Sequence, residues 1–246
     1  MPGLYRDRGV VLRTHKLGET DRIVTFMTEA RGKVRAVAKG VRKPGSRFGA
    51  RLEPTSHVAL QLYEGRNLDV VTQAEAVDVH PSLRADYDSY THAVAMLEAT
   101  DHVAQEGDAN SALYRLLVGA LRTLASRPGP GVAVGFFWKL LSLEGVHPLL
   151  DHCASCGEPV QPVAMAAFDA HEGGVVCLGC AGPTPSLVSP EGRAVVGRIL
   201  GGDLRGVLAE PPGLALREAE TLALHALEHH LERRLRSRPL LTTGLG

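Results

Sequence analysis

The placement of the cysteines constrains this 246-residue sequence most, because all four fall in two identical short motifs. The motifs span 153–156 (CASC) and 177–180 (CLGC), with twenty residues between them. Two residues between a pair of cysteines allow one tight turn to direct both sulfurs at a single ion. Two such turns complete a tetrahedron of thiolates at about 2.3 Å from zinc. The spacing therefore predicts one structural zinc ion with four ligands: Cys153, Cys156, Cys177 and Cys180.

Other interpretations of the cysteines remain open at this stage. Two disulfides would require an oxidising compartment, a redox pair would require one motif at a helix start after a strand, and the thiols could simply be unpaired core residues. Four thiolates leave no open coordination position, which argues against a hydrolytic metal. We expect the metal to fold an insert over 151–184, which has little core of its own.

The first 80 residues are predicted to form a small closed β-sheet. Short runs rich in Val, Ile, Leu and Thr are separated by turn residues, and 33–39 alternate polar with apolar positions, a period of two. A five-stranded Greek-key barrel of the OB type is the natural candidate for 1–80. The strands are expected at five places: Gly9–Arg13, Arg22–Thr28, Lys33–Lys39, His57–Tyr63 and Leu68–Gln73.

From Ser82 onward the pattern becomes helical. Helices are expected over 82–106, 111–125, 132–144, 191–200 and 214–236, and the third is apolar nearly all round, which places it at the centre of a helical core. Arginines crowd the predicted end of the last helix, where cations suit the helix dipole. The predicted fold is thus an α+β multi-domain chain, with a helical domain formed by 81–150 and 185–246 around the insert.

Charge is distributed unevenly along the chain. Residues 1–51 contain thirteen Lys or Arg and four Asp or Glu, a net charge of +9. Because the whole chain has 27 residues of each sign, residues 52–246 carry −9. A basic end joined to an acidic remainder suggests one surface for a polyanion and another for a different partner.

Eight of these cations lie between Arg31 and Arg51 without any acid among them. A row of cations along a strand and a glycine-rich loop is typical of binding to phosphate backbones, without readout of base sequence. Phe48, if exposed in this loop, would stack on a base. The plainer interpretation is a solvated edge strand protected from aggregation by its charges.

Several function classes lack their sequence signatures. The chain has no nucleotide-binding glycine motif and no catalytic motif of a hydrolase or metalloprotease, so we expect no enzyme and no nucleotide cofactor. It has no signal-peptide core and no apolar run of the length that a membrane helix needs, so we expect a cytoplasmic protein without membrane contact. Three rivals remain: a zinc-ribbon RNA-binding or transcription accessory factor, a metalloenzyme acting on nucleic acid, and a purely structural scaffold.

The basic region and its flanks resemble the N-terminal signature of the RecO family of bacterial DNA repair and recombination mediators. The resemblance lies in residues 18–24 (GETDRIV), 32–44 (GKVRAVAKGVRKP), Ser46-Arg47 and Glu53-Pro54, and the four-cysteine insert suits it too. It implies an OB-fold domain, a helical domain and, in many members, a zinc-binding insert, with no bond cleavage.

The resemblance also implies partners and site residues. Members bind single- and double-stranded DNA, anneal complementary strands, and act with RecR to load RecA onto strands coated by single-strand-binding protein, whose C-terminal tail they contact. A nucleoid-associated location in bacterial cytoplasm follows from such a role. Carried over by position, the phosphate contacts are Lys33, Arg35, Lys39, Arg42, Lys43, Arg47 and Arg51, and the zinc ligands are the four cysteines.

Overall fold

The computed structural model describes residues 3–243, which divide into two compact units. One unit holds the chain up to Pro128 together with the end from Pro239, and the other holds Gly129–Arg238. The boundary at Pro128 lies inside the stretch predicted as the first part of the helical domain, 81–150. Within 3–243, every helix is either too short or too polar to span a lipid bilayer.

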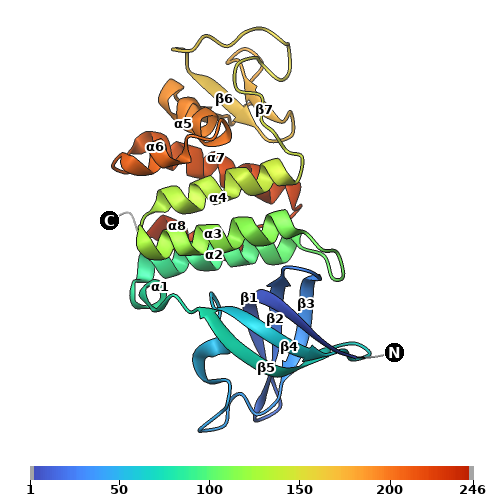
Figure 1. Cartoon of the computed structure of the whole chain (residues 1–246). Helices are drawn as coiled ribbons and strands as arrows, with labels where there is room; N and C mark the ends of the chain where they lie inside the picture. The colour runs from blue at the N-terminus through green and yellow to red at the C-terminus, as the bar shows by residue number, and fades with distance from the viewer. Residues whose placement is uncertain (1–2, 244–246) are drawn as a thin grey trace. The chain divides into compact units, whose positions relative to one another are not determined.

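The first unit is built on a closed five-stranded barrel (Figure 1). The strand order is β1-β2-β3-β5-β4, with β4 pairing back to β1, and only the β3–β5 pair is parallel. This is the OB arrangement that the sequence predicted. The strands are β1 (Leu4–Leu17), β2 (Asp21–Thr28), β3 (Gly32–Ala38), β4 (His57–Tyr63) and β5 (Asp69–Asp78).

The alternation seen in the sequence determines which side chains enter the barrel. In β3, Val34, Ala36 and Ala38 are buried in the barrel core, whereas Lys33 and Arg35 point away from it. β1 is much longer than predicted, and a register shift between Val11 and Arg13 lets it pair with both β2 and β4. Such a bulge bends a strand and so helps to close the sheet.

The basic loop, residues 39–52, differs from the expectation in one respect. Phe48 is only 1% exposed and packs in the barrel core, so the predicted stacking of its ring on a base is wrong. Leu52, at the end of the short 3-10 helix η1 (Gly49–Leu52), is buried in the same core. These two buried side chains, with the partly buried Val41, anchor the loop on the barrel core.

Three helices follow the barrel in the first unit: α1 (Pro81–Ala85), α2 (Tyr87–Val103) and α3 (Ser111–Ser126). α2 and α3 pack against β1 (Figure 1). The single helix expected over 82–106 is wrong, because Asp86 adopts an extended conformation and caps α2 by accepting a hydrogen bond from the Ser89 amide. A side-chain cap of this kind starts a new helix.

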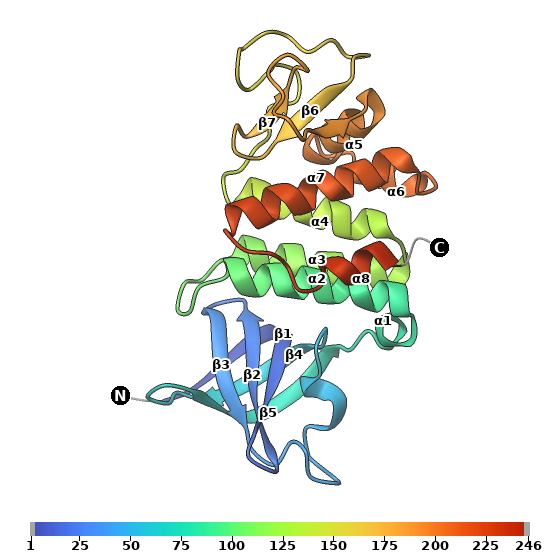
Figure 2. The same cartoon turned by 180° about the vertical axis from the view of Figure 1, so that it is seen from behind.

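The second unit is mostly helical (Figure 2). It contains α4 (Pro130–Leu143), α5 (Pro190–Leu200), α6 (Leu204–Ala209) and α7 (Leu214–His230). α4 is buried nearly all round, as predicted, and its Trp138 donates a hydrogen bond of 3.0 Å to the Ala219 carbonyl of α7. The insert and the residues just after it form a small sheet that the sequence did not reveal, in the order β7 (Gly174–Val176), β6 (Ala166–Asp169), β8 (Ser186–Val188).

The last long helix is shorter than predicted. It ends at His230 and not at Arg236, because Glu232 adopts a left-handed conformation with φ 51°. The amides of Glu232 and Arg233 then bond the carbonyls of His229 and Glu228, the pattern of a Schellman motif. The arginines that follow therefore lie beyond the helix and not in its last turn. A short helix, α8 (Arg238–Thr243), comes after them.

Candidate functional site

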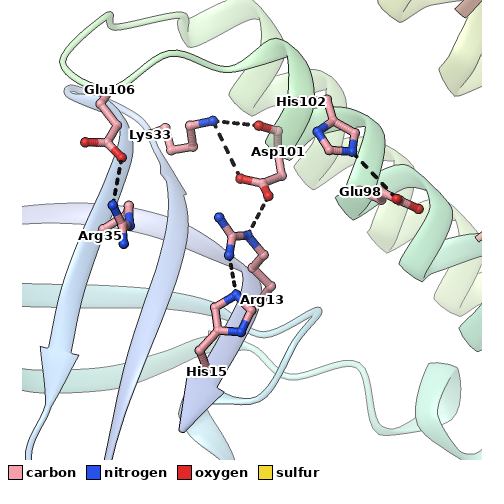
Figure 3. A network of polar contacts seen from close by, with 8 residues as sticks. All are labelled: Arg13, His15, Lys33, Arg35, Glu98, Asp101, His102 and Glu106. Carbon is pink, nitrogen blue, oxygen red and sulfur yellow. Dashed lines mark hydrogen bonds and ion pairs between the residues drawn. The ribbon is translucent and has the colours of Figure 1, made fainter. Parts of the chain in front are cut away.

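The predicted phosphate contacts fall into two groups, and the first lies on β3. Lys33 donates from Nζ to the Asp101 carbonyl at 2.6 Å and lies 3.6 Å from the carboxylate of the same residue in α2. Arg35 lies 3.7 Å from the carboxylate of Glu106 (Figure 3). Both strand cations therefore already have a carboxylate partner within the protein.

Asp101 links the barrel to the helix that packs on it. Its carboxylate accepts a 2.5 Å hydrogen bond from Arg13 of β1, in addition to its ion pair with Lys33, and its side chain is 12% exposed (Figure 3). Charge-assisted hydrogen bonds to a largely buried carboxylate are strong, because the carboxylate is shielded from water. We assign Lys33 chiefly to holding α2 against the barrel, and its role in DNA binding stays a prediction.

The second group lies in the basic loop and at its start. Its members are exposed, and within 3–243 none of them has a carboxylate within 4.0 Å. When no carboxylate lies beside a cation, its attraction for an external anion is not offset within the protein. The group consists of Lys39, Arg42, Lys43, Arg47 and Arg51.

Backbone contacts hold the start of the loop against the β1–β2 turn. The Gly40 amide donates to the Asp21 carboxylate at 2.8 Å, and Arg42 donates through its amide to Thr20 and through its guanidinium to the Glu19 carbonyl. The Gly40 hydrogen bond is the main reason why the pKa of Asp21 is lowered. Gly40 has φ +67°, a left-handed conformation that a side chain would strain.

This arrangement suits a polyanion and not a small substrate. The five loop cations present flexible charged ends to solvent, which is how proteins neutralise successive phosphates. Among the described residues, the metal-ligating side chains that gather in a group of three or more are the four cysteines of the second unit.

The four predicted metal ligands come together in the insert of the second unit. Their Sγ atoms all lie within 4.8 Å of one another, and Cys156 and Cys177 are 4.0 Å apart. Sulfurs bound to one zinc ion in a tetrahedron are separated by about 3.8 Å, so this cluster fits the metal with little adjustment. All four cysteines are free thiols, which does not support the disulfide alternative.

The protonation of the cluster points to the same conclusion. The pKa of Cys153 is lowered to about 6, first by the amide of Cys156 and then by that of Cys177, which donates to its sulfur at 3.2 Å. The pKa of Cys180 is raised to about 12, mainly by its side-chain contact with Cys177. Crowded thiols cannot all ionise without a compensating cation, and a bound metal ion supplies that charge. Four cysteines could thus hold a metal ion.

The sequence did not single out Arg84, which joins the basic loop in space. Arg84 lies in α1, and its guanidinium donates to the Val79 carbonyl at 2.7 Å and to the Ser56 hydroxyl at 3.2 Å. It lines one pocket together with residues 46–51. No local pattern could have revealed this, because 32 residues lie between Arg51 and Arg84.

The closed barrel with its basic loop, and the helical unit with its cysteine insert, define the class: an OB-fold protein whose second unit is helical and carries a cysteine cluster. The protein-family model described as Recombination protein O N terminal matches residues 1–80. A second family model, described as Recombination protein O C terminal, matches residues 84–239. A DNA repair protein RecO from Nocardioides sp. is 47% identical over 238 residues, which cover 95% of this chain and 97% of the relative. The chain belongs to the RecO family of DNA repair proteins.

Proposed function

We propose that this chain is a non-enzymatic recombination mediator that binds single- and double-stranded DNA and anneals complementary strands. With RecR, it helps to load RecA onto strands coated by single-strand-binding protein, whose C-terminal tail it contacts. The family membership supports this role. The observation that carries it is the group of five exposed loop cations without a carboxylate partner.

The mechanism follows from electrostatics. Two complementary strands repel each other through their phosphates, and the loop cations reduce this repulsion while releasing condensed counterions. The bases stay free to pair, because phosphate contacts position a strand without reading its sequence. Pairing then proceeds without ATP, in keeping with the missing nucleotide motif.

The metal has a structural role in this proposal. Cys153, Cys156, Cys177 and Cys180 would hold one zinc ion and so stabilise the fold of the insert. A closed set of four thiolates has no position for water or substrate. We therefore expect that the barrel binds DNA without any contact between the metal and the DNA.

The direct test replaces Lys39, Arg42 and Lys43 with Ala and measures DNA affinity over a range of salt concentrations. We expect weaker binding to unrelated sequences alike, and a salt dependence that is shallower by roughly one unit per lost contact. An unchanged dependence of log affinity on log salt concentration would show that these residues do not contact DNA. Strand annealing should decline in parallel with affinity.

A complementary variant is Glu106→Gln, which removes a negative charge where the first test removes positive ones. It removes the carboxylate that lies 3.7 Å from Arg35 and leaves every cation in place. If DNA uses Arg35, affinity should rise slightly, by a factor of about two to five, because an exposed ion pair is worth up to about 1 kcal/mol. An unchanged affinity would indicate that DNA contacts the loop cations and not Arg35.

The competing function is a zinc-ribbon RNA-binding or transcription accessory factor, which would share the barrel, the cysteines and the basic loop. Competition between single-stranded DNA and RNA of matched sequence separates the two. Tighter binding to RNA, with no annealing of DNA strands, would favour the accessory factor.

A further inference from the structure

A pocket of about 550 Å³ lies in the first unit, between the basic loop and the segment that follows the last barrel strand. Residues 46–51 line one side of it, and Val79, Pro81 and Arg84 line the other. Three of the lining residues are arginines and none is acidic. The pocket is therefore strongly positive, unlike the β3 surface with its carboxylate partners.

The contacts of the three arginines leave them able to bind a ligand. The Arg47 guanidinium lies 4.9 Å from the centre of the Phe48 ring, and Arg51 donates to the Arg47 carbonyl at 2.7 Å. Arg84 donates to neutral oxygens of Val79 and Ser56, while its buried Nε has no hydrogen-bond partner in the described structure. A guanidinium has five N–H donors, so the exposed Arg47 and Arg51 keep several of them for a ligand. Arg84 keeps its Nη1 group, because Nη2 makes both contacts and Nε is buried.

Apart from the arginines and Ser46, the lining is apolar. Ala50, Val79 and Pro81 contribute hydrocarbon surface, and a Cβ added at Gly49 would meet no atom within 4 Å, so the backbone there faces open space. A bare phosphate needs cations but no apolar wall. A nucleotide needs both, because its base has flat apolar faces that stack on guanidinium planes, and its phosphate accepts hydrogen bonds from them.

We propose that this pocket receives one nucleotide of a DNA single strand, with the base against the apolar wall and the adjoining phosphate on the arginines. Arg84 becomes a DNA-binding residue, and the strand continues along Lys39, Arg42 and Lys43. A paired base cannot enter a pocket of this kind, so only an unpaired strand uses it. The proposal rests on the proposed DNA binding, and it names the part of the ligand that the pocket holds.

The decisive experiment fills the pocket without changing any charge. Ala50 is exposed and lines the pocket, so Ala50→Trp should occupy the space of the base. The two probes are an oligothymidylate and an abasic oligomer of equal length, which carry the same phosphates. We expect a loss of affinity for the oligothymidylate of about tenfold, within the range of alanine substitutions at stacking sites, and no change for the abasic oligomer.

Controls separate the pocket from general effects of the new side chain. Ala209→Trp places the same bulk on an exposed alanine of the second unit and should alter neither affinity. If the thermal melting of Ala50→Trp shows a folding defect, Ala50→Leu fills part of the pocket with a smaller group. It should then weaken oligothymidylate binding by a smaller factor.

Arg84 is tested by charge. Arg84→Gln should make the salt dependence shallower by roughly one unit with both probes, and Arg84→Lys should restore it, because the phosphate contact depends on charge. Arg115→Gln removes an exposed arginine of α3 outside the pocket and is the matched control. Melting curves check that the lost contacts to Val79 and Ser56 have not unfolded the unit.

The outcomes distinguish two failures. If the unmodified protein binds neither probe, the proposed function fails. If it binds both probes and Ala50→Trp weakens both equally or neither, the pocket holds no base and this inference fails while DNA binding stands. An unchanged salt slope in Arg84→Gln would remove Arg84 from the strand's path.

Discussion

Two stretches of the chain have opposite compositions and are held in place by different physical means. Residues 31–51 carry eight cations and no acid, whereas residues 140–192 carry six acids and neither Lys nor Arg. The basic stretch is anchored by Phe48 and Leu52, which are each 1% exposed in the barrel core. The acidic stretch contains the insert, where the four cysteine sulfurs lie within 4.8 Å of one another.

The difference shows how a polar segment acquires a defined shape. The basic loop packs on a core that the barrel strands form, through Phe48 and Leu52, and its start is held by hydrogen bonds to the β1–β2 turn. The insert contributes two of the three short strands of a small sheet, and we propose that a zinc ion held by its four cysteines supplies much of its stability. The two segments should therefore respond to different perturbations.

The largest effect is expected from Cys153→Ser, which removes the most buried sulfur of the cluster. Structural zinc contributes about 10 kcal/mol or more to the folding of small metal-binding domains, so the insert should lose its structure. Metal analysis should give one zinc per chain for the unmodified protein and a marked loss in the variant. Amide hydrogen exchange should accelerate across 151–188, and amides of the barrel should keep their protection.

Ser155→Ala, between the first two cysteines, is the matched control and should retain the metal. Freshly purified protein without zinc would overturn the proposal for the metal. Rapid exchange in the barrel of Cys153→Ser would show that the two segments are not held independently.

Phe48→Ala should have the next largest effect, now on the barrel. Removing a fully buried phenylalanine costs about 3–5 kcal/mol, through lost burial and the cavity left behind. Urea unfolding followed by barrel amides should show this loss, with the zinc content unchanged. Phe48→Leu should recover most of the stability. A change below about 0.5 kcal/mol in the alanine variant would mean that the ring is not buried.

The smallest effects concern pH, and they have opposite signs in the two units. Burial lowers the pKa of His57, which contacts Tyr114 in the first unit, from 6.5 to about 4. The folded state then binds fewer protons than the unfolded state, so stability falls as the pH drops from 6.5 towards 4. Burial raises the pKa of Glu220 in the second unit from 4.5 to about 7, so stability there rises as the pH drops from 7 towards 4.5.

Hydrogen exchange measured over this pH range, with correction for intrinsic rates, should show the two trends in the amides of each unit. Their size should be about 1–3 kcal/mol, since one pKa unit corresponds to 1.36 kcal/mol. His57→Gln should flatten the first trend and Glu220→Gln the second. Trends that persist in these variants would assign the titration to other groups.

Local patterns predicted a large part of the fold. The alternation in 33–39 identified the buried face of β3, and the all-apolar helix was placed correctly at the centre of a helical core. The spacing of the cysteines predicted that their sulfurs would meet. Each of these rests on a period or a short spacing, which the backbone geometry of strands, helices and turns translates directly into space.

Features that depend on distant residues could not be predicted in this way. The loop pattern suggested an exposed Phe48, but the barrel interior offered more burial than the surface. The end of α7 depends on Glu232 adopting a left-handed conformation, which its residue type does not favour. The small sheet of the insert consists of strands too short for an alternating pattern to be visible.

The sequence by itself determined the barrel, the helical remainder, the cysteine cluster and the excess of positive charge near the start, because each is encoded in neighbouring residues. Only the tertiary structure decided which cations lie beside a carboxylate and which are left to attract an external ligand. Asp101 and Glu106 approach Lys33 and Arg35 from about 70 residues away, whereas Arg84 joins the loop arginines at a pocket without acids. The electrostatic environment of a charge is set by every group within a few ångströms, and the chain's folding brings those groups together.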